Sequence, residues 1–261
     1  MDTDKINEIL RKADGIWGAA VKPIGNGFLF EHNANGEFRA ASVGKVPIAL
    51  YLLYLVETNG ARLEDRFVVS AEYYQPGSGV LSRLTPGVEL TLKDLVVLML
   101  TVSDNTAADL LVKAHGADKI NNYLTSLGFQ KTQLGIKDDD FDFGATTPRE
   151  MAVMLEGIYS ARYLNREHSD LLLQIMKECE NQLGIKRLLP YTRRDGAKLE
   201  TANKGGSHDR LRNDIGIVFT KQPYVIAIFS KDLPMVSYKP DNPGWLTIAR
   251  LSAEVYAGLG R

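Results

Sequence analysis

Strand-like segments lie near both ends of the chain, and the long stretch between them has the spacing and punctuation of helices. Near the start, residues 16–22 and 27–31 are short strand-like runs joined by a Pro-Ile-Gly-Asn turn, which predicts a hairpin. Beyond residue 190, strands are expected again at 199–204, 215–220 and 224–230. This layout favours an antiparallel sheet to which both ends of the chain contribute.

Helices are expected near both termini, over residues 3–14 and from about 243 to 259. The predicted fold class is α/β in the α+β sense, with a five-stranded antiparallel sheet, terminal helices that flank it and an all-helical inserted domain. We predict a discontinuous sheet domain, residues 1–40 and 190–261, and a helical domain, residues 41–189. A candidate site would lie between the two.

The helical stretch carries its own start signals. Thr91 is a candidate cap for the helix that follows it. The strongest signal combines Thr147 as N-cap, Pro148 at the first helical position and Glu150 at the third. This pattern predicts a capping box, in which the threonine and the glutamate each bind a backbone N–H of the first turn.

Charge and cysteine content exclude several classes of protein. With 31 basic and 32 acidic residues the chain has almost no net charge, so no overall field favours nucleic acid or an anionic membrane as partner. The single cysteine excludes an internal disulfide, and four scattered histidines argue against a structural zinc site. We expect no metal or other cofactor, a small molecule as partner, and a monomer.

No membrane span or secretory signal is expected from the sequence as given. The longest apolar runs, residues 46–56 and 95–102, are too short to cross a bilayer and are better explained as buried helices. Residues 1–15 are polar and lack the apolar core of a signal peptide. Location stays open between the cytoplasm and an exported protein whose signal has been removed.

A serine and a lysine at the start of the first apolar run form the first candidate site. Residues three apart on a helix share a face, so a helix that begins near Ser42 brings the Lys45 amine beside the serine hydroxyl. The positive end of the helix and burial both disfavour the ammonium form, and a neutral Lys45 could take a proton from Ser42. About 0.7 such pairs are expected by chance, so the alternative is a solvated helix end.

Ser103-Asp104-Asn105 is the second candidate element. It follows the apolar run 95–102, where a buried helix ends and the next begins, so its polar side chains would reach the interior. The alternative is an ordinary helix cap, which these residue types also favour.

Lys204-Gly205-Gly206, followed by Ser207, is the third candidate element. It ends a predicted strand, and two adjacent glycines let a ligand or another backbone approach closely. The lysine would supply positive charge to a substrate carboxylate, while the strand edge offers main-chain hydrogen bonds. The alternative is a plain turn.

Taken in order, the three elements resemble the signatures of class A β-lactamases and penicillin-binding proteins. The flanking text is similar too: Phe-Arg-Ala-Ala precedes Ser42, Asn-Thr-Ala-Ala begins at Asn105, and Thr-Thr-Pro begins at Thr146. The resemblance covers residues from about 15 to 255. It implies the fold of that family and acyl transfer through a serine.

The resemblance implies a role for each residue of the first two elements. Ser42 would be the acylated nucleophile, and Lys45 its proton acceptor, directly or through a neighbour. Ser103 would relay a proton to the leaving nitrogen, and Asn105 would orient Lys45 and the substrate amide.

The third element would bind the substrate. Lys204 would hold the substrate carboxylate in a positive field, and the N–H groups of Ser42 and Ser207 would form the oxyanion hole. The family usually has a hydroxyl residue where this chain has Gly205. Ser207, or Arg212 further along the chain, could take over part of the carboxylate binding.

A second departure from the family lies in residues 135–144. Class A β-lactamases have a Glu-x-x-Leu-Asn motif, whose glutamate activates the water that clears the acyl-enzyme, and this chain has a shorter acidic segment instead. One of Asp138, Asp139, Asp140 or Asp142 could serve as the base. We favour the alternative, a solvated acidic loop.

These residues predict a serine hydrolase of the β-lactamase family that forms an acyl-enzyme on Ser42 with β-lactams or D-Ala-D-Ala-like substrates, with weak or moderate β-lactamase activity. The shortened loop resembles penicillin-binding proteins that share the fold and act as D-Ala-D-Ala peptidases. The alternatives are therefore a D,D-peptidase or esterase, and a β-lactam-binding sensor that stays acylated. A helical interaction scaffold is also possible, but the order and spacing of the three motifs argue against it.

Overall fold

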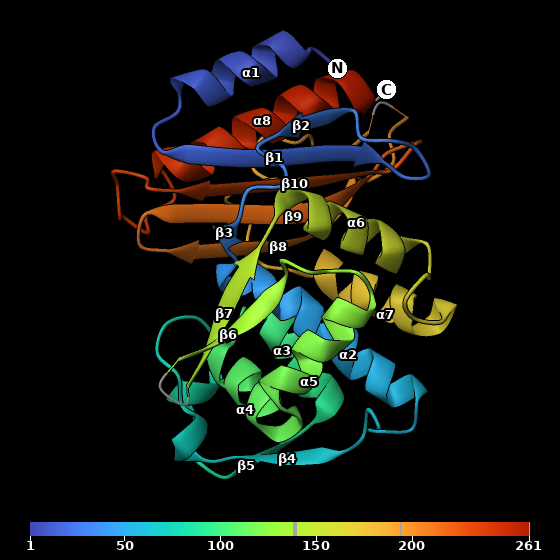
Figure 1. Cartoon of the computed structure of the whole chain (residues 1–261), viewed down its shortest axis with the longest axis vertical. Helices are drawn as coiled ribbons and strands as arrows, with labels where there is room; N and C mark the ends of the chain where they lie inside the picture. Colours follow the sequence, from blue (N-terminus) through green and yellow to red (C-terminus); the bar gives the residue numbers. More distant parts are fainter. Residues whose placement is uncertain (138–139, 194, 261) are drawn as a thin grey trace.

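The computed structural model describes residues 1–137, 140–193 and 195–260. Within them, five strands form one antiparallel sheet in the order β2-β1-β10-β9-β8 (Figure 1). The start of the chain supplies two and its end supplies three: β1 (Ile16–Pro23), β2 (Phe30–His32), β8 (Glu200–His208), β9 (Leu211–Phe219) and β10 (Tyr224–Lys231). The predicted sheet built from both chain ends is confirmed, and β8 is one of its edges.

Strands β8 and β9 are longer than the sequence indicated. The expected strand at 199–204 continues through two glycines to His208, and its partner begins at Leu211 rather than at residue 215. Glycine weakens a strand without breaking it. Here Gly205 stays in register with Asp214, so the glycines lie within the strand.

The terminal helices α1 (Thr3–Lys12) and α8 (Pro243–Leu259) pack side by side on one face of the sheet (Figure 1). Both were expected at these positions. Their apolar side chains meet those of the sheet in one buried cluster, which includes Ile6, Trp17, Ile226, Trp245 and Ile248. This layer stabilises the sheet from the side away from the helical part of the chain.

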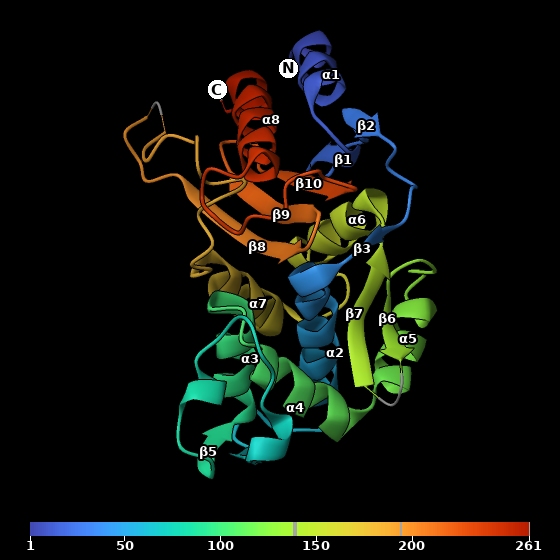
Figure 2. The ribbon, with the colours of Figure 1, turned by 90° about the vertical axis from the view of Figure 1, so that its left-hand side faces the viewer.

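The other face of the sheet meets the helical part of the chain. Its helices are α2 (Lys45–Glu57), α3 (Leu92–Thr101), α4 (Asn105–His115), α5 (Ala117–Ser126), α6 (Pro148–Tyr159) and α7 (Arg166–Lys177). Figure 2 shows α2 at the centre of this part, with its first turn below the sheet. Every residue of α2 from Lys45 to Leu53 is buried, which explains its unbroken apolar sequence.

The expectation that residues 41–189 are entirely helical needs correction. Two short antiparallel sheets lie in this part: β4 (Arg66–Val69) pairs with β5 (Val88–Thr91), and β6 (Gln133–Lys137) pairs with β7 (Asp140–Thr146), which also pairs with β3 (Phe38–Arg39). This part also contains the 3-10 turns η2 (Ala71–Tyr73) and η3 (Leu81–Arg83). Helix α6 also packs on β1 and β10, so it serves both parts of the molecule. The domain boundaries themselves stay a prediction.

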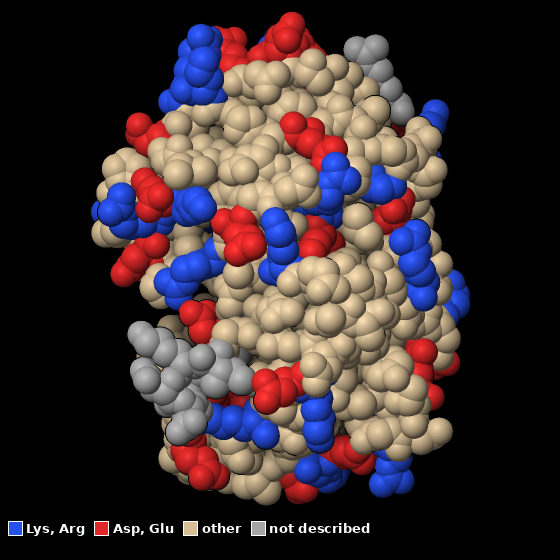
Figure 3. Space-filling view, viewed as in Figure 1, with Lys and Arg blue, Asp and Glu red and all other residues tan. Residues whose placement is uncertain are grey.

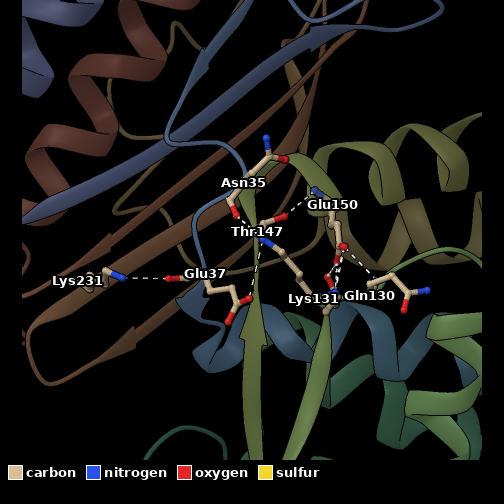
Figure 4. Close-up of polar contacts among 8 residues, drawn as sticks. Asn35, Glu37, Gln130, Lys131, Thr147, Glu150 and Lys231 are labelled. Atoms are coloured by element: carbon tan, nitrogen blue, oxygen red, sulfur yellow. Dashed lines mark hydrogen bonds and ion pairs between the residues drawn. The ribbon is translucent and has the colours of Figure 1, made fainter.

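The start of α6 shows how the hairpin β6–β7 is fixed. Thr147 is the N-cap, as predicted, and its hydroxyl accepts from Glu150 N at 3.1 Å. The Glu150 carboxylate does not complete the predicted box but accepts from the backbone of Gln130 and Lys131 (Figure 4) and from the Thr132 hydroxyl. The N–H groups of Gln130 and Lys131 belong to no helix or strand and need acceptors, which the Glu150 carboxylate supplies. These contacts therefore fasten the segment before β6 to α6.

Other contacts drawn in the same close-up join this region to the sheet. Lys131 Nζ donates to the Asn35 carbonyl at 2.9 Å and lies 4.0 Å from the Glu37 carboxylate (Figure 4). Lys231 of β10 donates to the Glu37 carbonyl at 3.2 Å. These bonds hold the chain just before β3, and thus the approach to Ser42, between the sheet and the hairpin.

The surface matches the balanced composition. On the face seen in Figure 3, basic and acidic side chains are interspersed and no extended patch of one sign appears. Among the described residues, no helix is both long enough and apolar enough to cross a bilayer.

Candidate active site

Ser42 lies in a 3-10 turn, η1 (Ala41–Gly44), that leads directly into α2. The first turn of the expected α-helix is thus wound more tightly than an α-helix. Ala41, just before the serine, has a φ of 46°, in the left-handed region that non-glycine residues adopt only at a cost. Strained residues of this kind cluster at functional sites, where the surrounding fold holds them.

The Lys45 amine is buried at the centre of a polar cluster. Its Nζ lies 3.3 Å from Ser42 Oγ and 3.1 Å from Ser103 Oγ, within hydrogen-bonding distance of both. It also lies 2.6 Å from the Ser103 carbonyl and 2.6 Å from Asn105 Oδ1. The Asn105 amide is correctly oriented for this, because its Nδ2 donates to the Pro76 carbonyl at 2.8 Å. The spacing of the first motif therefore does place the amine beside the hydroxyl.

Burial lowers the pKa of the Lys45 amine well below its usual value, because the ammonium form loses its hydration. The nearby charge of Lys204 lowers this pKa further, while Asp104 acts in the opposite direction. Two of the four neighbours of the amine, a carbonyl and an amide oxygen, can only accept hydrogen bonds. A neutral amine would give its two N–H bonds to them and turn its lone pair toward the two serine hydroxyls.

The three residues of the Ser103-Asp104-Asn105 element have different roles. Asp104 is a helix cap, as the alternative explanation held: it begins α4, and its buried carboxylate accepts from the backbone N–H groups of Ala107, Val80 and Leu81. Ser103 has a φ of 60°, another left-handed position. The cap thus anchors a strained turn that points the side chains on either side of Asp104 toward Lys45.

Lys204 comes to the same place from the sheet. Its Nζ donates to Ser103 Oγ at 3.0 Å and to the Gly205 carbonyl at 3.1 Å. The side chain is buried, and burial lowers the pKa of Lys204, an effect that Cys179 and Asp214 oppose. Ser103 Oγ therefore lies between two lysine amines, where a hydroxyl is well placed to pass a proton.

Gly206 lets the edge strand lie against the start of α2. A Cβ on this residue would stand 3.0 Å from the backbone nitrogens of Ser42 and Val43. Alternate N–H groups of an edge strand have no partner in the sheet, and the N–H groups of a helix start are also free. The close approach therefore brings the edge strand β8 against the turn that carries Ser42.

Two cavities open at this junction. The smaller, of about 190 Å³, is lined by Ser42, Ser103, Lys204 and Ser207 together with Asn181 and others. The second, of about 550 Å³, shares Ser42 and Ser207 and adds Arg39, Asn105, Asp142, Phe143 and Tyr238. A larger cavity of about 990 Å³ lies at the start of α8, and none of the candidate residues lines it. A substrate that reaches Ser42 would meet Lys204 and Asn105, whereas the fully buried Lys45 lines neither cavity.

Comparison with known proteins assigns the chain to a family. A sequence model described as the β-lactamase enzyme family matches residues 3–259. The chain belongs to the β-lactamase enzyme family. Its activity type is that of β-lactamase hydrolases.

Relatives and solved structures agree with this assignment. A β-lactamase of Bacteroides uniformis is 28% identical over 97% of this chain and 89% of its own length. The crystal structure of a β-lactamase from Sphaerobacter thermophilus superposes with a TM-score of 0.88 at 30% identity, covering 99% of both chains. A mutant of PBP-A, solved as an acyl-enzyme complex with penicillin G, has the same fold: TM-score 0.86 at 24% identity, covering 99% of this chain and 97% of that one.

The structure does not bring Arg212 into the candidate site of this protein. Its side chain is fully buried, and the guanidinium donates to the carbonyls of His208, Leu211 and Ser237. It also lies 5.0 Å from the ring of Tyr238. Arg212 thus holds the loop after β10 in place, and the suggestion that it binds the substrate carboxylate has no support in this geometry.

The described residues on both sides of the acidic stretch form the paired strands β6 and β7 rather than the loop we favoured, although the Asp142 side chain is 43% exposed. Asp138 and Asp139 lie outside the described residues, as does the side chain of Asp140. Asp142 lines the cavity of about 550 Å³, but its carboxylate accepts from Arg39 Nη2 at 3.1 Å and from Gly144 N at 3.0 Å. The hairpin forms because β7 has a partner on each side, a long-range contact that overrides the polar composition.

Phe143 was missed by the sequence analysis. Its ring lies 4.8 Å from Lys45 Nζ and lines the cavity that contains Ser42. The backbone holds it there: Ala40 N donates to the Gly144 carbonyl at 2.8 Å, and a Cβ on Gly44 would stand 2.8 Å from the Phe143 carbonyl. An aromatic ring thus covers the lysine on the side of the hairpin.

Proposed function

We propose that this protein is a serine acyl hydrolase that uses Ser42 as its nucleophile against β-lactams and related acyl compounds. One observation carries the proposal: the buried Lys45 amine has two acceptor-only neighbours at 2.6 Å and two serine hydroxyls at 3.1 and 3.3 Å. That arrangement leaves a lone pair free to receive the Ser42 proton. The β-lactamase relatives and the penicillin G complex of PBP-A support the substrate class.

Acylation would proceed by proton transfer and addition. Ser42 Oγ forms a bond to the carbonyl carbon of the substrate as its proton passes to Lys45 Nζ. The oxyanion is stabilised by unpaired N–H groups at η1 and β8, which we assign to Ser42 and Ser207. The C–N bond then breaks, and a proton reaches the leaving nitrogen through Ser103 Oγ, which lies 3.1 Å from Lys45 Nζ.

The substrate would be held by its charged and polar groups. Lys204 is a buried cation at the end of the cavity with no carboxylate at ion-pair distance among the described residues, and a substrate carboxylate would supply that partner. Asn105 would hold both Lys45 and the substrate amide. Its Nδ2 already donates to the Pro76 carbonyl, so the second proton of the same nitrogen remains for the substrate.

Release of the acyl group is the slow step in this proposal. Deacylation needs a base beside the ester, and the side of Lys45 toward the hairpin is covered by the Phe143 ring. Asp142 already accepts two hydrogen bonds and is ion-paired with Arg39. We therefore favour a long-lived acyl-enzyme with β-lactams and weak turnover. Hydrolysis of D-Ala-D-Ala-like peptides or esters, whose leaving group departs and admits water, is the second candidate.

One experiment separates these outcomes. The protein is mixed with a chromogenic cephalosporin while colour and intact mass are recorded together. We expect a burst close to one equivalent, a retained adduct on Ser42 and slow colour formation afterward. Sustained rapid colour would show efficient deacylation. If the protein shows neither colour nor adduct, and Ser42→Ala behaves identically, the proposed nucleophile is wrong.

The acylation rate is expected to depend on pH through Lys45. Because burial lowers the pKa of the Lys45 amine, the amine loses its proton at a lower pH than a free lysine, whose pKa is about 10.4. A base must be unprotonated to act, so the burst rate should be low in acid and rise to a plateau as Lys45 loses its proton. Stopped-flow bursts from pH 5 to 9 test this, and a flat profile would contradict it.

Gly206→Ala is expected to slow acylation about tenfold to a hundredfold. The new Cβ would stand 3.0 Å from Ser42 N and Val43 N, so β8 must move away from η1 and carry its N–H groups out of place. The burst rate of adduct formation measures the effect. Gly27→Ala is the matched control, because a Cβ there would meet nothing within 4 Å, and it should react like the wild type.

A further inference from the structure

The third signature element has Gly205 where the family usually has a hydroxyl residue, and the structure shows what fills the space. A Cβ on Gly205 would stand only 1.9 Å from Asn181 Nδ2 and 2.9 Å from Asn181 Cγ. No side chain larger than hydrogen fits at residue 205 while Asn181 is in this position. The asparagine amide therefore occupies the volume that a residue-205 side chain would take.

The orientation of this amide is fixed by a backbone bond. Asn181 Oδ1 accepts from Leu183 N at 3.0 Å, and a backbone N–H can only donate. The oxygen must therefore face Leu183, which leaves the NH₂ group on the side of Gly205. The segment is anchored further along, where Ile185 N donates to the buried Asp214 carboxylate at 2.8 Å. The amide is thus held in place before any ligand arrives.

The NH₂ group has donors to offer and no acceptor. Among the residues that the structure describes, none accepts a hydrogen bond from Asn181 Nδ2. The residue is only half-buried, and it lines the cavity that contains Ser42, Lys204 and Ser207. An amide nitrogen that faces a cavity without a partner is a binding group for an oxygen acceptor.

The neighbouring charge indicates that this acceptor is anionic. Lys204 is buried at the same cavity, and its amine contacts only a hydroxyl and a carbonyl among the described residues, with no carboxylate at ion-pair distance. The Asp214 carboxylate, which acts on the pKa of Lys204, accepts instead from Ile185 N and Asn203 Nδ2. Glu180 also lines the cavity, but it is an exposed residue that water can solvate. A buried cation beside an unused amide donor suits a ligand carboxylate, whose two oxygens can accept from both.

We propose that Asn181 binds the substrate carboxylate together with Lys204, and that its side-chain amide does so in the space left by Gly205. The proposal rests on acylation of Ser42 and names the residue that selects anionic substrates for it. Oδ1 stays bonded to Leu183 N, and Nδ2 donates to one carboxylate oxygen. Asn181 and Gly205 form a matched pair, since either residue alone would leave a clash or an empty space.

The test compares a chromogenic cephalosporin with its carboxylate methyl ester. Asn181→Asp keeps the bond to Leu183 N but turns a negative oxygen toward the cavity. We expect the half-saturating concentration for Ser42 acylation to rise at least about tenfold with the acid, and the limiting rate to change little. The ester should react with this variant and the wild type alike. A merely structural role would affect acid and ester equally and would overturn the proposal.

A second set of variants covers the case in which Asn181→Asp folds poorly. Asn181→Ala should show a smaller loss confined to the acid. Gly205→Thr alone should react slowly with both substrates because of the clash, whereas Asn181→Ala combined with Gly205→Thr should recover discrimination in favour of the acid. No recovery in a double variant that melts like the wild type would count against the matched pair.

The wild type separates this inference from the proposed function. If the unmodified protein forms no adduct on Ser42 by intact mass, the proposed function fails and the role of Asn181 falls with it. If the wild type is acylated but acid and ester show the same dependence on Asn181, the proposed function stands and the assignment of Asn181 is wrong.

Discussion

Replacing Lys45 by methionine is expected to slow formation of the Ser42 adduct by about a hundredfold to ten-thousandfold. Methionine has a similar length and suits a buried position, but it has no lone pair that can take the Ser42 proton. The pH dependence of the burst should disappear together with the rate, because the titrating base is gone. Intact mass against time, at several pH values, measures both effects.

The control for this prediction is Lys12→Met. Lys12 is also a hydrogen-bonded lysine, but its side chain is 71% exposed and its partner is Glu8, one turn earlier on α1, on the sheet face away from Ser42. This variant should react like the wild type. Adduct formation at the wild-type rate in Lys45→Met, with thermal melting unchanged, would show that another group accepts the proton.

Replacing Phe143 by glutamate is expected to shorten the lifetime of the β-lactam adduct by about tenfold to a hundredfold. The ring lies 4.8 Å from Lys45 Nζ, so a carboxylate at this position would stand beside the amine and beside any water that approaches the ester. The same carboxylate would raise the pKa of Lys45 again by stabilising its ammonium form, so acylation should become slower at neutral pH. A chase with excess unlabelled β-lactam gives the adduct lifetime.

Phe143→Leu is the matched variant, because it removes the ring but adds no base. Its adduct should last about as long as that of the wild type. Equal lifetimes in the glutamate and leucine variants would mean that water, and not a missing base, limits release.

Much of the fold could be predicted because local patterns and tertiary structure agree. The apolar runs of β1 and β10 are buried along almost their whole length, and α2 is apolar on all sides because it is central. Thr91 and Asp94 form the complete capping box that Thr147 and Glu150 were expected to form. The Glu150 carboxylate instead accepts hydrogen bonds from the backbone of Gln130 and Lys131, before β6. These donors lie some 20 residues away, so no local sequence pattern reveals them.

The candidate site was predictable where its residues lie in contiguous motifs and not elsewhere. Ser42, Lys45, Ser103 and Lys204 do meet, because each motif sits at the end of a helix or on a strand edge. Phe143 and Asn181 lie in segments with no motif of their own. Their places depend on β7 pairing with β3 and on a loop that packs against Gly205, and both contacts span long stretches of sequence. The glycine at residue 205 was the one visible signal.

The order of strands in the sheet also bears on synthesis. β1 lies between β2 and β10, so its main-chain partner on one side is the last strand of the sheet to leave the ribosome. A nascent chain that ends before residue 200 already contains Ser42, Lys45 and the tripeptide Ser103–Asn105. It lacks β8, the strand that forms the other side of the candidate site. We therefore expect such incomplete chains not to react with β-lactams, and expect acylation of Ser42 only when translation is almost complete.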